Sequence, residues 1–203
     1  KAMKRFLAYL FLVLVLTFNF QSLTKADDIR DFEIEGISIG DSLLNFMTES
    51  EIISAKNNST KMGKDYLLIY YYYLPSGSKL YDYVSVAIDK NDKQYTVEAI
   101  TGNLIFDNDI EACEKKKNVI VKEIKSLFKN INVSDRENVI HPIDPTGKTV
   151  FSSFDVNFDS GAWATVGCTD WSEKMTKEKG WKDHLDLGIN SSKYTNFLRK
   201  HYD

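Results

Sequence analysis

Apolar residues occupy every second position in two neighbouring stretches near the middle of the chain. These residues are Val84, Val86 and Ile88, followed by Tyr95, Val97 and Ala99. The turn sequence Asn91-Asp92 separates the two stretches, so the alternation predicts an antiparallel hairpin. The next apolar residues take the opposite parity: Ile100, Leu104 and Phe106. Because Gly102 lies at this change of phase, we expect a bulge there, or a bend into a further strand.

Two other regions also carry strand patterns. Thr149–Asp159 alternates well, and a turn at Ser160-Gly161 leads into Trp163–Trp171, which predicts a second hairpin. Tyr66–Leu74 is rich in strand-forming residues and contains four consecutive tyrosines, Tyr70–Tyr73. Both of its faces are apolar or aromatic. This favours a central strand covered on both sides over an aromatic platform for a sugar or peptide.

The spacing of apolar residues changes to a helical period after the first hairpin. The apolar face consists of Cys113, Ile120, Ile124, Leu127, Phe128 and Ile131. Asn108 and Glu111 form a helix-start pattern, so we expect a long helix over Asp109–Lys129. Lys115, Lys116 and Lys117 are expected on its solvated side rather than in a polyanion-binding patch.

Shorter helices and loops complete the predicted fold. Thr48-x-x-Glu51 is a capping box that predicts a short helix, and Gly180 ends another that begins at Glu173. A C-terminal helix follows Ser192, and Ser134–Lys148, which contains two prolines, is expected to be a loop. We therefore predict one α+β domain over residues 27–203. Its antiparallel sheet has five or six strands, packed against one long helix, with short helices at both ends.

The first residues indicate export. A short positive start precedes the apolar run Phe6–Phe20, whose 15 residues fall short of the roughly twenty that a spanning helix needs. Polar and small residues follow as far as Ala26. We expect a signal peptide over residues 1–26 that is removed, so that no membrane span remains. Thr17 and Asn19 dilute the apolar run, which disfavours the alternative of an uncleaved anchor.

The charge of the mature chain argues against two classes of partner. Removal of residues 1–26 takes away four basic residues. The mature chain then has 22 basic and 29 acidic side chains, a net charge of −7. Nucleic acids and anionic membrane surfaces would repel such a protein. Only four of the 26 basic residues are arginine.

The two cysteines, Cys113 and Cys168, predict one disulfide in an exported protein. Free thiols or a redox pair are the alternatives, but a redox pair needs closer spacing. The bond would close a loop of 55 positions, which the chain-entropy account values at about 4 kcal/mol.

Motifs for catalysis and metal binding are weak. Asp155-x-Asn157-x-Asp159-x-Gly161 resembles a calcium loop, but its glycine is one position late and no closing glutamate follows. These residues are expected instead on the wet face of a strand, and no metal or other cofactor is predicted. His141, with Asp144 nearby, is the best candidate for a general base, but a surface loop histidine without a catalytic role is the favoured interpretation.

Three tryptophans around Cys168 give the one candidate site. Trp163, Trp171 and Trp181 either pack over the disulfide as core residues or line a ligand groove. The groove would lie between the second hairpin and the C-terminal segment.

The run EIEGISIGDSLLNFMTESEI, which follows a short signal segment, resembles a group of uncharacterised small exported proteins from AT-rich marine alphaproteobacteria. The resemblance extends through the first hairpin and the long helix. It implies no activity and transfers no functional residue. The helix-then-sheet order is also similar to small envelope domains of the β-lactamase-inhibitor-protein type, but no specific motif supports this second likeness.

These observations favour a non-catalytic binding or interaction module, periplasmic or secreted, over an enzyme. Its partner would be an envelope protein or a small ligand. Two alternatives remain: a small exported hydrolase that uses His141 and nearby carboxylates, and a purely structural envelope protein.

Overall fold

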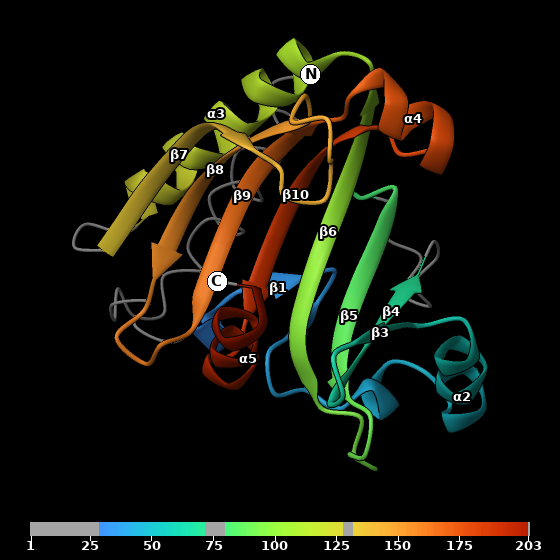
Figure 1. Cartoon of the computed structure of the whole chain (residues 1–203). Coiled ribbons are helices and arrows are strands. Elements are labelled where there is room, and N and C mark those ends of the chain that lie inside the picture. The colour runs from blue at the N-terminus through green and yellow to red at the C-terminus, as the bar shows by residue number, and fades with distance from the viewer. Residues whose placement is uncertain (1–28, 72–79, 128–131, 203) are drawn as a thin grey trace, which may run out of the picture.

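An eight-stranded antiparallel sheet forms the body of the protein (Figure 1). The computed structural model describes residues 29–71, 80–127 and 132–202. The strands are β3 Thr60–Met62, β4 Tyr66–Tyr71, β5 Tyr83–Asp89, β6 Val97–Asp107, β7 Asn132–Ile140, β8 Val150–Asn157, β9 Trp163–Asp170 and β10 Asp183–Asn190. They lie in the order β3-β4-β5-β6-β10-β9-β8-β7. The α+β class and the antiparallel sheet are confirmed, but the expected count of five or six strands is wrong.

Four α-helices accompany the sheet in the described part of the chain: α2 Glu49–Asn57, α3 Ile110–Leu127, α4 Glu173–Lys179 and α5 Ser192–Tyr202. A small ribbon, β1 Glu33–Ile34 with β2 Ile37–Ser38, and two short 3-10 turns precede them. No helix within the described residues combines the length and apolar character needed to cross a membrane. The predicted signal peptide and residues 72–74 of the tyrosine-rich stretch lie outside the described residues.

Two strands account for most of the difference from the expected count. β7 occupies residues predicted as a loop, because the prolines that suggested the loop follow the strand rather than interrupt it. β10, which has no prediction, lies between β6 and β9 near the centre of the sheet. Its apolar residues, Leu185, Leu187 and Ile189, alternate with polar residues and glycine. The predicted central strand, β4, is instead second from the edge, although both of its faces contact apolar side chains.

The change of phase after the first hairpin is real, but it lies earlier than expected. Ala87 pairs with Ala99 while Ile88 pairs with Val97, so Glu98 is the extra residue of the bulge. β6 then continues without a break through Gly102. The glycine is needed for space, because a Cβ there would lie 2.5 Å from the Tyr81 ring.

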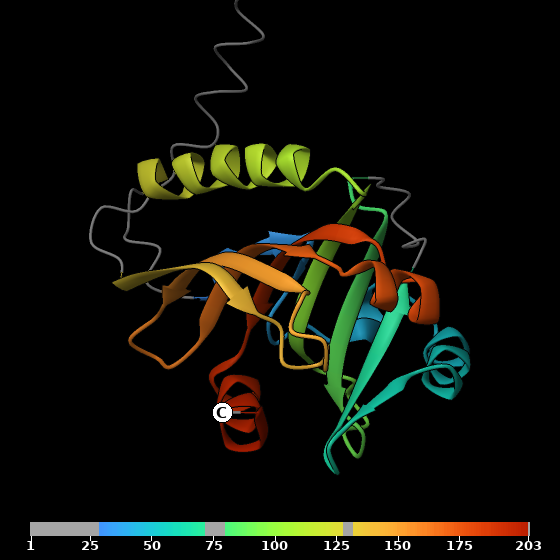
Figure 2. The same ribbon diagram turned by 45° about the horizontal axis from the view of Figure 1, so that its top comes forward.

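One face of the sheet is closed by α3 and the N-terminal segment, and α5 lies on the opposite face (Figure 2). The helix start lies one residue later than the predicted Asn108–Glu111 pattern, because the Asp109 carboxylate accepts a hydrogen bond from the Ala112 N–H (3.0 Å). Cys113 on α3 and Cys168 on β9 form the predicted disulfide, with their Cα atoms 6.1 Å apart. Both cysteines are buried in the main apolar core, so the bond fixes the helix to the centre of the sheet.

The assignment of all three lysines to the solvated side of α3 is wrong for Lys117. Its side chain is buried, donates a hydrogen bond to Ser152 Oγ (2.6 Å) and forms an ion pair with Glu114 (2.7 Å). The Ser152 hydroxyl in turn donates to Glu114. This closed set of contacts joins α3 to β8 beside the disulfide.

The smaller core lies between α5 and the other face of the sheet. It contains Tyr66, Ala87, Ala99, Tyr194 and Phe197. The two alanines leave room on β5 and β6 for the aromatic side chains of the helix. The predicted C-terminal helix is therefore confirmed, and so are the capping box of α2 and the left-handed Gly180 after α4.

Candidate ligand groove

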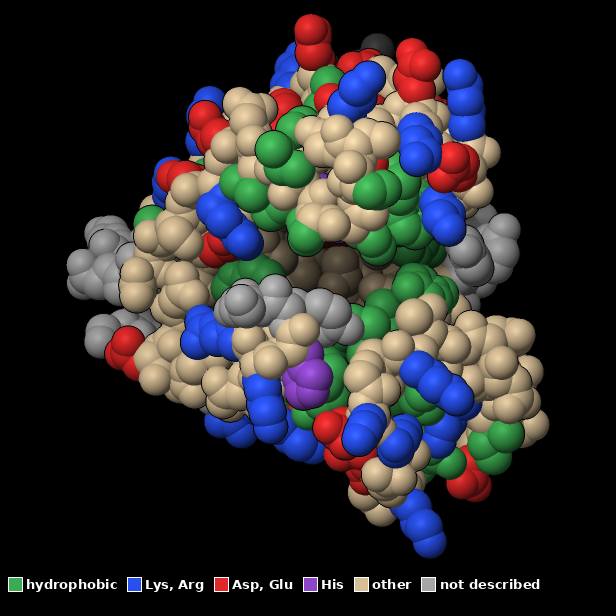
Figure 3. Space-filling view, viewed as in Figure 1, with side chains coloured by type: hydrophobic (Ala, Val, Ile, Leu, Met, Phe, Trp, Pro, Cys, Tyr) green, Lys and Arg blue, Asp and Glu red, His purple; other side chains and the backbone are tan. Residues whose placement is uncertain are grey.

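A groove of about 620 Å³ runs between α5 and the strands β7, β8 and β9, on the face opposite α3. Figure 3 shows this face hollowed across its middle, with hydrophobic side chains beside the hollow and a floor of backbone and uncharged polar groups. The residues that matter most for its chemistry are Arg136, His141, Phe151, Asp155, Trp163 and Arg199. A smaller recess of about 180 Å³ shares four of them and extends across β9 towards β10.

Alternation along the strands places polar side chains on the floor of the groove. On β9, Ala164, Val166 and Cys168 enter the main core, so Trp163, Thr165 and Gly167 face the groove. Gly167 lies between Ser153 of β8 and Asp186 of β10 in the sheet register. A Cβ at Gly167 would lie 3.0 Å from the Ser152 carbonyl oxygen. The missing side chain therefore deepens the floor.

A hydrogen-bonded cluster fixes Arg136 at the side of the groove. Arg136 Nε donates to Asp155 Oδ2 (2.9 Å) and to Ser153 Oγ (3.1 Å), and Nη2 lies 2.9 Å from Asp155 Oδ2. The Thr165 hydroxyl donates to the other oxygen, Asp155 Oδ1 (2.6 Å). Asp155 is thus buried rather than on a wet face, and the arginine occupies the position a cation would need. No cluster of three or more His, Cys, Asp or Glu that could hold a metal occurs among the described residues.

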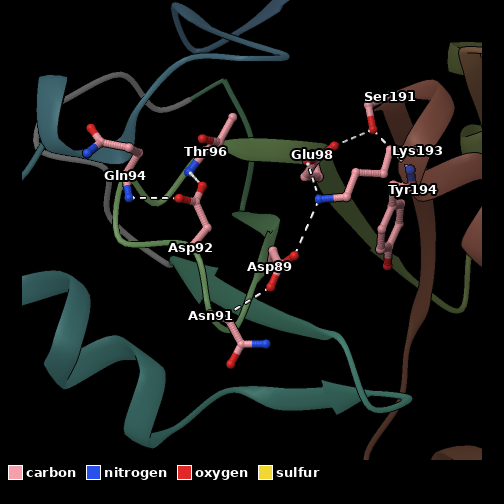
Figure 4. A network of polar contacts seen from close by, with 9 residues as sticks. All are labelled: Asp89, Asn91, Asp92, Gln94, Thr96, Glu98, Ser191, Lys193 and Tyr194. Carbon is pink, nitrogen blue, oxygen red and sulfur yellow. Dashed lines mark hydrogen bonds and ion pairs between the residues drawn. The ribbon is translucent and has the colours of Figure 1, made fainter.

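The opposite wall, α5, is held in place by the bulge in β6 (Figure 4). The Glu98 carbonyl accepts from the Ser191 N–H (2.8 Å), and its carboxylate accepts from the Ser191 hydroxyl (2.6 Å). Lys193 of α5 reaches both Glu98 (3.2 Å) and Asp89 (3.3 Å). The Ser191 hydroxyl also accepts from the Tyr194 N–H (3.0 Å), which caps the helix. Burial opposes the charge of Lys193, but Glu98, Tyr66 and Asp89 outweigh it and raise its pKa.

The three tryptophans lie on the groove face, but at two different places. Trp163 lines the groove itself. Trp171 and Trp181 contact each other with ring centroids 4.5 Å apart, and Trp171 lies 5.0 Å from His141 at the edge of the groove. All three are half-buried. Packing of Trp163 over the disulfide is wrong, because Cys168 points to the α3 face.

His184 of β10 is a member of the groove face that the sequence did not reveal. Its Nε2 lies 3.3 Å from Asp186 Oδ2, and its Nδ1 lies 2.8 Å from the Lys182 carbonyl oxygen. Burial alone would lower its pKa, but the hydrogen bond and charge of Asp186, aided by Lys182 and Asp183, raise the pKa to about 9. The charged ring donates both N–H groups to these acceptors. The Trp171 indole N–H, 3.2 Å from Nδ1, can donate to His184 only when the ring is neutral.

His141 lies at the edge of the groove without the partner that a general base needs. Its Nδ1 accepts from the Ile143 N–H (3.3 Å), and burial and the nearby His184 lower its pKa. Asp144 is committed to its own loop, where it accepts from the backbone N–H and hydroxyl groups of Thr146 and Thr149. Although desolvation opposes it, these bonds hold the pKa of Asp144 well below its usual range. The geometry gives no histidine–carboxylate pair among the described residues around His141.

The contact between Ser152 and Lys117 on the α3 face is the other arrangement with catalytic residue types. It borders a recess of about 330 Å³ between α3 and β8. A serine nucleophile needs a base that can accept its proton. Lys117 instead forms an ion pair with Glu114, and the serine proton is directed at the same carboxylate. The three residues form a structural tie.

No protein-family model, curated protein or solved structure matches this chain. The resemblance to exported alphaproteobacterial proteins stays a prediction. The function must therefore be argued from the groove.

Proposed function

We propose that the chain is an exported, non-catalytic binding module, periplasmic or secreted, whose small-molecule ligand occupies the groove between α5 and β7–β9. The observation that carries this proposal is the groove itself, a space of about 620 Å³ with an aromatic wall and a rigid polar floor. Small-molecule sites typically measure about 300–1,000 Å³ and combine an apolar lining with a few fixed polar groups.

The polar groups of the floor favour binding over catalysis. Asp155 is saturated by Arg136 and Thr165, so it is available neither as a base nor as a nucleophile. No carboxylate in the described part of the chain orients His141, so the structure offers no support for a hydrolase there. A purely structural role would not require the open floor at Gly167.

Export is supported by two features. The disulfide between Cys113 and Cys168 is of a kind that persists in oxidising compartments. The expected signal peptide over residues 1–26 would deliver the chain there. An export test in a bacterial host should yield periplasmic protein whose mass corresponds to cleavage after Ala26 and to no free thiol.

The binding proposal is tested by ligand capture. The exported protein is mixed with a small-molecule extract of bacterial envelopes and medium, separated by size exclusion and measured by native mass spectrometry. Wild-type protein and Trp181→Ala should retain the same small molecule, whereas Trp163→Ala should lose it. Equal retention by Trp163→Ala, or no retained molecule in any extract, would contradict the proposal. Thermal unfolding confirms that each variant is folded.

A further inference from the structure

We propose that the groove selects an organic anion, a carboxylate joined to an apolar body. This inference rests on the proposed binding function and names the class of ligand. Two arginines on facing walls would hold the carboxylate, and the aromatic and aliphatic side chains between them would cover the body.

Arginine is concentrated at this site. The whole chain contains four arginines, and two of them, Arg136 of β7 and Arg199 of α5, line the groove. Lysine supplies the other 22 basic residues of the chain, but the described lining of the groove contains none. The guanidinium group presents a planar fork of N–H donors that matches a carboxylate, which a lysine ammonium does not.

Arg136 is positioned before any ligand arrives. Asp155 and Ser153 fix its Nε edge, and its guanidinium carbon lies 5.3 Å from the centre of the Phe151 ring. These contacts use the Nε–H and one N–H of Nη2, so the other N–H donors of the guanidinium group remain for a ligand. With 43% of the side chain exposed, those donors can reach a ligand in the groove without reorganisation of the arginine.

Arg199 supplies a charge that no described residue cancels. The charge of Arg136 is balanced by Asp155, and that of His184 by Asp186. Arg199 is exposed, and its guanidinium forms no hydrogen bond or ion pair with any described residue. By contrast, Lys193 on the same helix is paired with two carboxylates. The described lining of the groove therefore carries a local positive charge within a mature chain of expected charge −7.

The neighbouring acidic residues do not reverse this balance. Asp135 pairs with Phe154, whose side chain enters the main core, so the carboxylate lies on the α3 side of β7. His141 adds no charge near neutral pH, because its pKa is lowered. An anion would thus meet two guanidinium groups and no unpaired carboxylate of the described lining.

The remaining walls are apolar, so they favour a ligand that has an apolar part over a simple inorganic ion. Trp163 and Phe151 lie on the strand side, Leu198 on the helix side, and Pro142 and Met62 at the edges. A small inorganic anion would contact the arginines but would leave these apolar side chains exposed to water. A carboxylate with an aromatic or aliphatic body uses both features of the groove.

The test compares ligands of the same shape that differ only in charge. The probes are 3-phenylpropanoate with 3-phenylpropanamide, and octanoate with octanamide. Binding is followed in ¹⁵N-labelled exported protein by the indole N–H signal of Trp163, assigned from Trp163→Phe, and by the arginine Nε–H signals. Each carboxylate should shift the Trp163 and arginine signals and bind at least about tenfold more tightly than its amide, as expected for a charge-assisted contact.

A pair of charge-matched variants locates the effect. Arg199→Gln should reduce the preference for carboxylate over amide about fivefold or more, whereas Lys200→Gln, which makes the same change at the next exposed position, should leave it unchanged. Equal binding of acid and amide at Trp163 would overturn the anion proposal and leave the binding function standing. Absence of any Trp163 shift with all four probes also overturns it, while the extract experiment decides the binding function separately.

Discussion

The two faces of strands β8, β9 and β10 differ sharply, although each strand supplies both. Towards α3, the residues are mainly apolar and are covered by the helix, which the disulfide and the contacts of Lys117 with Ser152 hold in place. Towards the groove, the same strands carry hydroxyls, ionised pairs and glycine, with a helix that covers only part of the surface. The first face holds the fold together, and the second is free to carry function. Matched substitutions on the two faces can test this division.

The largest contrast is expected between two phenylalanines of β8. Phe154 is 1% exposed in the main core, so Phe154→Ala should lower the free energy of unfolding by about 3–5 kcal/mol. Phe151 is half-buried at the groove, and Phe151→Ala should cost about 1–2 kcal/mol because fewer contacts are lost. Denaturant unfolding measures both. Equal losses would show that the groove face also carries the stability of the sheet.

The next effect concerns pH and the groove-side His184. Its pKa is about 9 in the folded protein against a model-peptide value of 6.5, so the folded state binds the proton more tightly. This stabilisation is fully present below pH 6.5 and is lost as the pH rises towards 9. Its full size is about 3 kcal/mol, at about 1.4 kcal/mol for each pH unit.

Unfolding measured at pH 6, 7.5 and 9 checks the effect, with His184→Gln as control. The wild-type protein should lose stability across this window, and the variant should lose much less. The pKa of His141 is lowered, so its titration changes the free energy of unfolding only in the range below about pH 6.5. A wild-type profile parallel to that of the variant would show that Asp186 does not hold His184 in its charged form.

A smaller effect is expected for the polar tie on the closed face. Lys117→Met removes the donor to Ser152 and the partner of Glu114, and should cost about 1–2 kcal/mol. Glu114 is partly exposed, so its carboxylate can regain water, which limits the loss. Lys115→Met, at an exposed position of the same helix, should change stability by less than about 0.5 kcal/mol. Indistinguishable variants would mean that apolar contacts alone join α3 to the sheet.

The sequence predicted the closed face better than the open one, for a physical reason. Apolar periodicity reports burial against a core, so it revealed α3, both hairpins and the place of Cys113. In β10 the alternation is present but short, with only Leu185, Leu187 and Ile189 to carry it, and it yielded no prediction. It is missing from β7, an edge strand with little burial. Lys117 was misplaced because its charge suggested water, whereas its partners, Glu114 and Ser152, come together only in the fold.

The site was harder to predict than the fold because its residues come from distant segments. Trp163 was a candidate from its place near Cys168, but the second hairpin gave no sign that Arg136 would lie against Asp155. That contact depends on the register of β7 with β8, which no local pattern specified. Arg199 likewise enters the groove only because the bulge at Glu98 anchors the start of α5.

The sharpest separation of the two faces is expected at Gly167, where the change in stability should be smallest. The residue does not have a positive φ, so alanine is compatible with its backbone. The added methyl group would lie 3.0 Å from the Ser152 carbonyl oxygen and 3.3 Å from Ser153 Cβ, so a shift of a few tenths of an ångström is required.

Gly167→Ala should therefore change the free energy of unfolding by about 1 kcal/mol or less, because alanine suits a strand better than glycine and partly offsets the crowding. The same methyl group raises the floor of the groove and should weaken binding of the captured molecule at least about tenfold. Gly147→Ala, at an open loop position with positive φ, is the control: it strains the backbone but leaves the groove unfilled. If Gly167→Ala lost stability but kept its ligand, the glycine would serve the packing of β8 on β9. The absence of a side chain at Gly167 would then be explained by strand packing and not by ligand binding.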